Sequence, residues 1–315
     1  MHWRSPIRAQ PDGPKLITIL NLSPAVDVTF EVDQLIAGRS HRVTKSHRKP
    51  GGKGVNVARI LSTAGIENQL VLPLGGASGA WIERELSDAG QLMEVIHSES
   101  ESRTSVAVMD GAATVFNETA PNPTKAELSQ VNDWLASAPV ADVCIVSGSM
   151  PSALLESEIA ALFKACRDHA RKLVIDTSGK NLLIAAKSAA DLVKPNRDEI
   201  IEATGVEDLR EAAMSLIELG AKSVLTSLGE DGAELHDRNG YLSATLTPAL
   251  GNPTGAGDAM TAASGWALFS GMASTELLKY ACAAGMLAVR EPVAGQLDWT
   301  ALAGETANVS VEGKK

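Results

Sequence analysis

The stretch DVCIVSGSMPSALLESEIAALFKACRDHARKLVIDTSGKNLLIAAKSAADLVKPNRDEI, residues 142–200, decides the fold class of this chain. Its three short apolar runs, DVCIVS, KLVID and DLVK, are typical of buried strands. The segments that follow them have helical spacing, and we predict helices from about Glu156, Lys180 and Arg197. Strands and helices that alternate in this way form a parallel sheet covered by helices on both faces. The stretch therefore predicts an α/β fold.

The same alternation continues on both sides. Upstream, KLITILNL (15–22) and NQLVLPL (68–74) are predicted strands, and helices are expected to end at Gly65 and Gly90. A capping box of Thr124 and Glu127 starts another helix. Downstream we expect a helix over 208–219, the strand SVLTS, a turn at Asn239-Gly240, and helices from Gly255 and about Ser274.

Two stretches, about 28–48 and 104–118, do not fit the main sheet. They alternate polar and apolar residues, and Asp110-Gly111 is a hairpin signal within the second. We expect them to form a small second sheet, for which a lid is the simplest use. We predict a single domain over residues 15–304. The polar ends, 1–14 and 305–315, are predicted to be flexible tails, the first of them a natural tail or sequence added for expression.

Composition narrows the class of function. The net charge of −10 argues against general binding to nucleic acid or to membrane surfaces. Three widely spaced cysteines form no metal pattern and suit a reducing compartment. The first residues lack the apolar centre of a signal peptide, and no stretch is apolar enough to span a bilayer. We therefore expect a cytoplasmic location.

PGGKGVNVAR, residues 50–59, looks like a phosphate-binding loop but is not a Walker A motif. Gly54 follows Lys53 where Ser or Thr is required, and no glycine stands at the required distance upstream. The preceding run, RSHRVTKSHRKPGGK, is basic and holds no acid, which suits an anionic small molecule. We expect most of these charges to face water on the lid, and we favour Lys53 because it lies between glycines.

A second glycine-rich segment, NPTGAGDAMTAASGWALF (252–269), places Gly255, Ala256 and Gly257 at the start of a long helix. Free N–H groups and the helix dipole make such an end an anion site. Asp258, in the first turn, would be able to accept a proton from a substrate hydroxyl. The alternative is an ordinary helix start with Asp258 favoured by the dipole. Methionine at position 260 excludes the dinucleotide fingerprint.

VKPNRDEI (193–200) places Lys194, Asn196 and Glu199 where a strand ends and a helix begins. Ligands bind at such strand ends in open α/β sheets. Asn196 and Glu199 suit magnesium held through water, or a helix cap, and the two interpretations are compatible. TSLGEDGAEL (226–235) adds a glycine turn that suits either a nucleotide wall or the entry to a hairpin.

Taken in order, these segments resemble the ribokinase/phosphofructokinase B family of sugar kinases, over nearly the whole chain from residue 16 to 293. The order and spacing of the motifs carry the resemblance: Asp27 in SPAVD, GGKGVNVAR, VSGSMPS, VIDTSG, VKPNRDE, SLGEDG and NPTGAGD. The chain looks closest to the branch of 1-phosphofructokinase and tagatose-6-phosphate kinase. The resemblance implies a ribokinase-like fold with a small β-sheet lid, and ATP and Mg²⁺ as cofactors. In several relatives the lid also forms a homodimer contact.

The resemblance also implies roles for individual residues. Asp258 would be the catalytic base, and the amides of Gly255, Ala256 and Gly257 the anion hole. Asp27, Gly52 and Asn56 would bind sugar hydroxyls, while Lys53 and Arg103 would lie near the substrate's own phosphate or the transferring group. Asn196 and Glu199 match the magnesium and phosphate motif. The nucleotide site would be lined by Lys194, Asn196, Ser227, Gly229 and Gly232.

The motifs depart from the branch pattern in several places. Ser23-Pro24 replaces the frequent Asn-Pro, VSGSMPSA carries Met150 and Ala153, and Thr254 stands where valine is frequent. We expect transfer of phosphate from ATP to a ketohexose monophosphate, with fructose 1-phosphate as first choice and tagatose 6-phosphate as second. A kinase of an unphosphorylated sugar and a non-catalytic sugar-phosphate sensor are the alternatives. The sequence leaves open which hexose phosphate and hydroxyl react, monovalent-ion dependence, oligomeric state and allosteric regulation.

Overall fold

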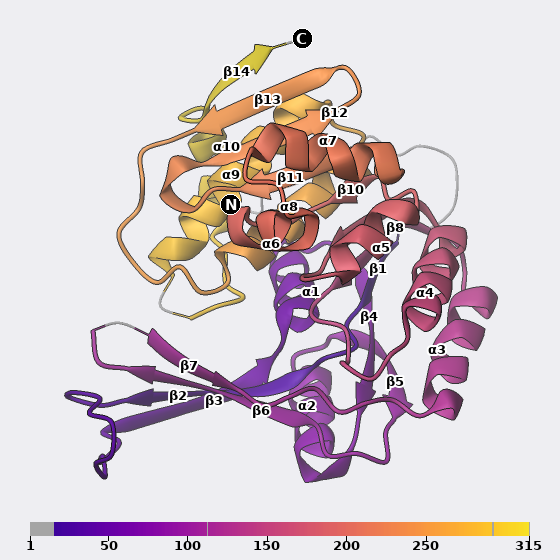
Figure 1. Cartoon of the computed structure of the whole chain (residues 1–315). Helices are drawn as coiled ribbons and strands as arrows, with labels where there is room; N and C mark the ends of the chain where they lie inside the picture. The colour runs from indigo at the N-terminus through magenta and orange to yellow at the C-terminus, as the bar shows by residue number, and fades with distance from the viewer. Residues whose placement is uncertain (1–15, 112, 292, 315) are drawn as a thin grey trace.

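The computed structural model describes residues 16–111, 113–291 and 293–314, and over them ten strands form one sheet in the order β14-β13-β12-β11-β10-β9-β8-β1-β4-β5 (Figure 1). Neighbours from β5 to β11 are parallel, and β12, β13 and β14 are antiparallel. The predicted mostly parallel sheet is confirmed. Its strands are β1 (Ile17–Leu20), β4 (Asn68–Leu74), β5 (Leu92–His97), β8 (Ala141–Ser147), β9 (Ala170–Asp176), β10 (Leu192–Val193), β11 (Ser223–Ser227), β12 (Ala233–Asp237), β13 (Gly240–Thr245) and β14 (Ser310–Lys314).

Helices cover both faces of this sheet because its central strands are apolar on both sides. In β8, Val143 and Ile145 face one core while Cys144 and Val146 face the other. The first core is completed by α1 (Lys53–Thr63), α2 (Gly76–Asp88), α8 (Ala256–Phe269), α9 (Ser274–Arg290) and α10 (Trp299–Thr306). The second is completed by α3 (Lys125–Ser137), α4 (Glu156–His169), α5 (Asn181–Lys187), α6 (Arg197–Thr204) and α7 (Leu209–Leu219).

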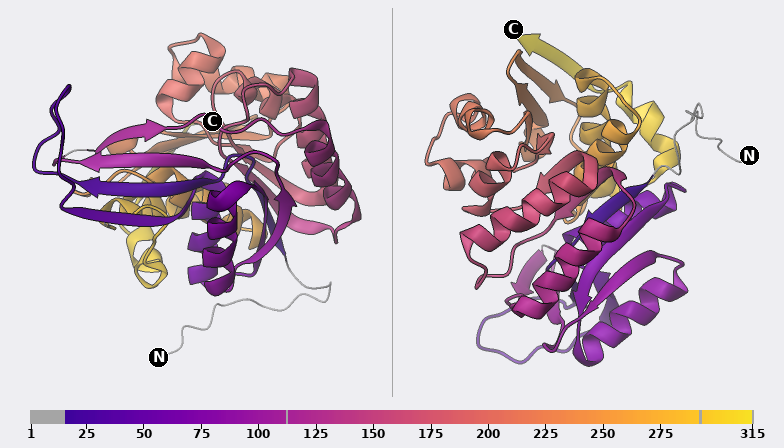
Figure 2. Two further views of the ribbon diagram at one scale, coloured as in Figure 1. Left: turned by 90° about the horizontal axis from the view of Figure 1, so that it is seen from below. Right: turned by 90° about the vertical axis from the view of Figure 1, so that its right-hand side faces the viewer.

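A separate four-stranded sheet, which we call the lid, projects from the main body (Figures 1 and 2). Its order is β3-β2-β6-β7, with β2 (Ala25–Glu31), β3 (Lys45–Gly51), β6 (Arg103–Met109) and β7 (Ala113–Asn117). The central pair β2 and β6 is parallel, although the two strands are far apart in sequence. The predicted small second sheet is confirmed, and it joins the two stretches that did not fit the main sheet.

Helix boundaries follow the predicted capping signals. Thr124 and Glu127 form the expected capping box at the start of α3. Asp208 is the N-cap of α7, one residue before the helix, and α9 begins at Ser274. A short 3₁₀ helix, η1 (Gly229–Asp231), lies between β11 and β12. Over the described residues, no helix combines the length and apolarity needed to cross a membrane.

The C-terminal residues correct the prediction of a flexible tail at 305–315. Helix α10 extends to Thr306, and β14 pairs antiparallel with β13 from Thr245 opposite Ser310. Val309 is buried and Val311 packs against the core, so the alternation of apolar and polar residues here is that of an edge strand. The other predicted tail, 1–14, lies outside the described residues.

His169, the last residue of α4, is buried with both ring nitrogens hydrogen-bonded. Nδ1 is 3.0 Å from the Leu135 carbonyl oxygen, and Nε2 is 3.0 Å from Thr18 Oγ1. Since a carbonyl only accepts, Nδ1 carries the hydrogen and Nε2 accepts from the Thr18 hydroxyl. Burial lowers the pKa of His169, against the opposing effect of the Leu135 hydrogen bond. The folded protein therefore favours the neutral ring.

This arrangement predicts an acid-sensitive contribution to stability. Because the folded pKa lies below the unfolded value of about 6.5, the contribution is complete above that pH and is lost as the pH falls through the folded pKa. His169→Gln should lower the free energy of unfolding by about 1 kcal/mol at pH 7.5 and should lose less on acidification than the wild type. Urea unfolding between pH 7.5 and 5 measures both. The exposed His97→Gln is the control, and equal pH slopes for His169→Gln and wild type would contradict the prediction.

Candidate active site

Of the predicted site residues, Lys194, Asn196 and Ser227 lie at the carboxyl ends of β10 and β11, whereas Asp27 and Arg103 lie on the lid. The strand order reverses at β1, which has β4 on one side and β8 on the other. Asp176 is the last residue of β9, and Lys194 follows β10 directly. A crevice at such a reversal is where open α/β sheets bind ligands. The lid strands β2 and β3 lead into the same region through Gly51 and the start of α1.

Asp176, which is fully buried, organises the positive charge of the site. Lys53 Nζ lies 3.1 Å from Asp176 Oδ1, and Lys194 Nζ lies 3.7 Å from Asp176 Oδ2. Burial raises the pKa of Asp176, but Lys194 and Lys53 outweigh it, so the pKa lies below its usual value. Asp176 correspondingly raises the pKa of Lys53. The cluster therefore joins one buried carboxylate to two lysine side chains.

The start of α8 lies against this cluster. Gly255 is the N-cap with φ 88°, a left-handed conformation that favours glycine. A Cβ on Gly257 would be 3.7 Å from Lys194 Nζ, so the lysine points at the helix start. The Ala256 amide donates to the Pro253 carbonyl at 3.2 Å. That bond occupies the Ala256 amide, one of the three amides expected in the anion hole.

Asp258 is buried and held by a side chain from α1. Asn56 Nδ2 donates to Asp258 Oδ2 at 2.8 Å. Burial, and then the nearby Asp176 carboxylate, raises the pKa of Asp258 to about 6. A carboxyl group with a pKa near neutrality, beside a helix N-terminus, has the properties of a general base.

The lid end of the site is built around Asp27 on β2. Its carboxylate lies so close over Gly51 that any side chain at position 51 would overlap it, and it accepts the Gly52 N–H. Burial raises the pKa of Asp27, while Lys49, Arg103 and Arg59 lower it. Lys49 is the register partner of Asp27 on β3, and its Nζ donates to the Ala294 carbonyl. Burial and Arg59 lower the pKa of Lys49 to about 8.

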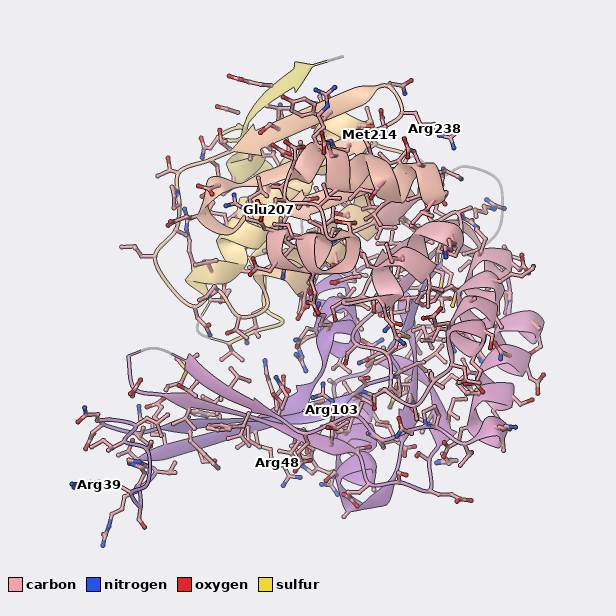
Figure 3. All side chains as sticks on the ribbon, in the orientation of Figure 1. Arg39, Arg48, Arg103, Glu207, Met214 and Arg238 are labelled. Atoms are coloured by element: carbon pink, nitrogen blue, oxygen red, sulfur yellow. The ribbon has the colours of Figure 1, made fainter. Side chains whose placement is uncertain are left out.

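Arg103 enters from the start of β6, where the lid joins the main body (Figure 3). Nη2 donates to the Ser23 carbonyl at 3.2 Å and Nη1 to the Glu118 carbonyl at 3.4 Å. Its buried Nε has no hydrogen-bond partner among the described residues. Arg39 and Arg48 lie on the exposed part of the lid instead, as predicted for most of the basic run.

Asn196 and Glu199 form the capping box of α6, so that interpretation is confirmed. Asn196 Oδ1 accepts the Glu199 amide and Glu199 Oε2 accepts the Asn196 amide, both at 2.8 Å. Glu199 Oε1 remains near Lys53 Nζ, at 3.6 Å. The magnesium hypothesis is compatible with this cap, since one carboxylate oxygen faces the lysine cluster. No group of three or more His, Cys, Asp or Glu side chains in the described part of the chain forms a metal cage.

An apolar pocket of about 420 Å³ adjoins the start of α8. Ser227, Gly229 and Gly232, which were predicted for the nucleotide site, line it together with Ala256 and Gly257, whereas Lys194 and Asn196 are not among its lining residues. Asn196 is joined to this wall through a parallel bridge with Ser227. The apolar lining of the pocket comes from Leu246, Pro248, Ala249, Leu250, Pro253, Met260, Cys282, Met286 and Val289. A pocket with such apolar walls suits a flat apolar group.

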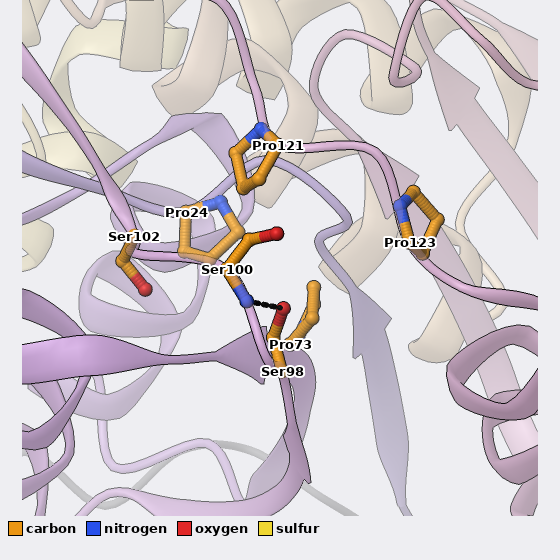
Figure 4. A pocket seen from close by; sticks show the side chains of 7 residues that line it. All are labelled: Pro24, Pro73, Ser98, Ser100, Ser102, Pro121 and Pro123. Atoms are coloured by element: carbon orange, nitrogen blue, oxygen red, sulfur yellow. Dashed lines mark hydrogen bonds between the residues drawn. The ribbon is translucent and has the colours of Figure 1, made fainter.

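A second hollow, lined by four prolines and three serines, is unsuited to a substrate (Figure 4). Its volume of about 10 Å³ is the size of one water molecule. Its lining residues are Pro24, Pro73, Ser98, Ser100, Ser102, Pro121 and Pro123. We therefore assign no ligand to it.

Three charged residues of the site escaped the sequence interpretation. Asp176 lay in the quoted motif VIDTSG, and its position at the end of a buried strand was the available signal. Lys49 had no role of its own in the basic run, most of which was expected to face water, and it lies half-buried beside Asp27. Arg59 is the last residue of the motif GGKGVNVAR and had no assigned role. The residues that were predicted lie together along one path from Asp27 to the apolar pocket.

A carboxyl group of raised pKa at the start of a helix, lysines around a buried carboxylate and an adjoining apolar pocket are features that suit a phosphotransferase site on an α/β fold. Residues 19–301 match the family described as pfkB family carbohydrate kinase. The match covers most of the chain, so the protein belongs to this family and is a carbohydrate kinase, an enzyme that phosphorylates an alcohol group.

Curated relatives support the expected branch. The chain is 28% identical to a 1-phosphofructokinase of Bacillus subtilis over 78% of this chain and 84% of the relative. It is 28% identical to a tagatose-6-phosphate kinase of Staphylococcus epidermidis over 90% and 95%. It is 33% identical to the ATP-dependent 6-phosphofructokinase isozyme 2 of Mycobacterium tuberculosis over 89% and 85%.

Solved structures confirm the ribokinase-like fold. Phosphofructokinase-2 from Escherichia coli, in complex with substrates and products, superposes with a TM-score of 0.85 at 25% identity, over 92% of this chain and 98% of that one. A ribokinase of Arabidopsis thaliana superposes with a TM-score of 0.73 at 21% identity, over 94% and 99%, and shows the shared fold.

The Asp176 cluster predicts a large cost for its neutralisation. Asp176→Asn would leave the buried Lys194 without a compensating charge and should destabilise the protein by about 3–5 kcal/mol. Asp168→Asn, which breaks the exposed pair with Lys164 on α4, should cost less than about 0.5 kcal/mol. Urea unfolding of the two variants measures the difference. Equal stability of Asp176→Asn and wild type would show that the lysines do not depend on this carboxylate.

Proposed function

We propose that the protein transfers the terminal phosphate of ATP to a ketohexose monophosphate and forms the bisphosphate, with fructose 1-phosphate as the preferred acceptor. The observation that carries this proposal is the position of Asp258. Its carboxylate lies between the lysine cluster of Asp176 and the basic lid end around Asp27. The base thus stands between a place for the arriving phosphoryl group and a place for an anionic acceptor.

The donor side is proposed from the apolar pocket and the helix start. The base of ATP would lie between the apolar walls, with its phosphates directed at the amides of Gly255 and Gly257. Lys194, buried beside Gly257, and Lys53 would neutralise the transferring group. Since phosphoryl transfer depends mainly on positioning and charge neutralisation, these groups would supply most of the rate enhancement.

Magnesium fits the residues present. Glu199 Oε1 is a carboxylate oxygen near Lys53, and magnesium commonly keeps several waters and binds one or two carboxylates together with phosphates. Glu199, with Asn196 orienting it through the cap, would hold the ion. When bound, it would neutralise charge on the donor's phosphates.

The acceptor side is proposed from an excess of positive charge. Lys49, Arg59 and Arg103 surround Asp27, and their pKa values respond to its charge. A buried donor without a partner, such as Arg103 Nε, carries a desolvation penalty that a ligand acceptor would relieve. A phosphate already on the sugar would supply that acceptor. Asp27 would then accept hydrogen bonds from sugar hydroxyls, and Asn56 would donate or accept them.

In this arrangement each residue of the chain has a defined task. Asp27, Gly52 and Asn56 would orient the sugar so that one hydroxyl reaches Asp258. Asp258 would accept its proton through the carboxylate oxygen that Asn56 does not hold. Lys53, because it pairs with Asp176, serves the arriving phosphate better than one already on the sugar.

The identity of the sugar phosphate is the finer part of the proposal. The branch resemblance favours fructose 1-phosphate, and tagatose 6-phosphate is second. The relative with 33% identity is named a 6-phosphofructokinase, which adds fructose 6-phosphate as a candidate acceptor.

We also propose that two copies of the chain form a homodimer through the lid, whose edge strand β7 exposes Val115 and Phe116. We further propose a cytoplasmic location.

Asp258→Asn tests the proposed base. The variant should lower kcat by about 10²–10⁴-fold, because the amide cannot accept a proton. Its affinity for ATP should change little, since the pocket walls remain. In the wild type, kcat should fall as the pH drops below about 6, where the raised pKa of Asp258 leaves the group protonated. Coupled ADP release and calorimetric ATP titration measure these effects, and near-normal turnover of the variant would refute the mechanism.

A panel of acceptors with Arg103→Met tests the substrate class. ADP release with fructose 1-phosphate, fructose 6-phosphate, tagatose 6-phosphate and fructose should be highest for one of the phosphates. Arg103→Met should raise the KM for that phosphate about 10- to 100-fold, the effect of one charged hydrogen bond, and leave activity on fructose unchanged. Preferred use of fructose, without an effect of Arg103→Met, would indicate a kinase of unphosphorylated sugars. ATP binding without ADP release on any acceptor would favour the sensor.

A further inference from the structure

Arg59 lies on the face of α1 that faces the active site, and none of the roles above includes its hydrogen bonds. Lys53, Asn56 and Arg59 follow one another at intervals of three residues, which places their side chains on one side of the helix. Lys53 pairs with Asp176 and Asn56 donates to Asp258. Arg59, the third residue of this row, donates a hydrogen bond to Asn56, the second.

The contact continues as a relay from Arg59 to the base. Arg59 Nη1 donates to Asn56 Oδ1 at 3.0 Å, and Asn56 Nδ2 donates to Asp258 Oδ2 at 2.8 Å. A guanidinium only donates and an ionised carboxylate only accepts, so the two neighbours agree on a single orientation of the amide. In the reversed orientation, the amide NH₂ would face the guanidinium and its oxygen would face the carboxylate. Arg59 and Asp258 together thus fix which end of Asn56 meets the carboxylate.

The relay is itself held in place by backbone from two other segments. Arg59 Nη2 donates to the Pro50 carbonyl at 2.5 Å, at the end of β3. The loop after α9 covers the other side, because a Cβ on Gly295 would lie 2.6 Å from both Arg59 Nη1 and Asn56 Oδ1. The guanidinium therefore has a backbone acceptor of its own, besides Asn56, and little room to move.

Charged groups face Asp258 from every side of the site. Asp176 raises its pKa, whereas Lys53 and Lys194 lower it. Lys49 and Arg59 interact with its charge from the lid end. Arg59 would therefore favour the ionised base by charge alone, and a test must separate that effect from orientation of the amide.

We propose that Arg59 is a positioning residue for the phosphoryl-transfer reaction, which orients the Asp258 carboxylate by fixing the amide of Asn56. The inference rests on the proposed function of Asp258 as the base. One carboxylate oxygen is held by Asn56, and the other is left to accept the proton of the substrate hydroxyl. Loss of Arg59 frees the amide to turn, so the carboxylate loses its fixed direction.

The experiment is a double-mutant cycle between Arg59→Met and Asn56→Ala, with the acceptor that the wild type uses best. Arg59→Met should lower kcat about 10- to 100-fold, with less than threefold change in the affinity for ATP. In the Asn56→Ala background, the same substitution should lower kcat by less than threefold, because the amide through which it acts is absent. The acid limb of the kcat profile should move to higher pH in Arg59→Met.

Arg59→Lys separates orientation from charge. It keeps the positive charge, but one ammonium group cannot reproduce the forked contacts with Asn56 Oδ1 and Pro50 O, so kcat should remain at least threefold below wild type. If circular dichroism shows that Arg59→Met does not fold, Arg59→Lys replaces it in the double-mutant cycle with Asn56→Ala. Arg48→Met, which removes an exposed lid arginine stacked over Trp81, is the matched control with unchanged kcat.

The outcomes distinguish the relay from the proposed function. Equal losses from Arg59→Met in both Asn56 backgrounds, or full kcat in Arg59→Lys, would overturn the relay while the kinase stands. A wild-type protein without ADP release on any acceptor would overturn both, since a positioned base would then have no substrate proton to accept.

Discussion

The buried carboxylate of Asp176 is the interaction on which the active site depends. It joins four elements, because it ends β9, accepts the Thr261 hydroxyl of α8 at 2.8 Å, and pairs with lysines from α1 and from the end of β10. A buried carboxylate is stable only with such compensation, and two buried or half-buried lysines need it equally. The charge cluster therefore fixes how α1 and α8 approach the sheet.

The same carboxylate adjusts the chemistry of its neighbour. Asp176 holds the lysines where a phosphoryl group would arrive, and its charge adds to the burial that raises the pKa of Asp258. On the other side of Asp258, Asn56 donates a hydrogen bond to its carboxylate, and Arg59 donates one to Asn56. Asp258, the proposed base, thus lies between two groups of cations, one at the helix start and one at the lid end of the site. In the proposed function, each group of cations would meet one of the two anionic substrates.

Much of the site could be predicted because glycine, capping and strand-end signals are local. TGAGD, GGKG and the Asn196–Glu199 capping box depend on residues only a few positions apart. Lys49 could not be assigned from its charge run, since its partners, Asp27 and the Ala294 carbonyl, come from distant segments. The C-terminal strand β14 was missed because its polar composition resembles that of a tail. Its strand structure comes from antiparallel pairing with β13, which composition does not reveal.

The sequence by itself determined the mostly parallel sheet, the separate small sheet and the helix starts that carry the glycine loops, because each follows from apolar periodicity and local capping. Only the tertiary structure decided which charges meet. Asn56 and Asp258 are 202 residues apart, and Lys53 and Asp176 are 123 apart, yet both pairs are hydrogen-bonded. No local pattern encodes such contacts, because they arise where separate elements converge at the carboxyl ends of the strands.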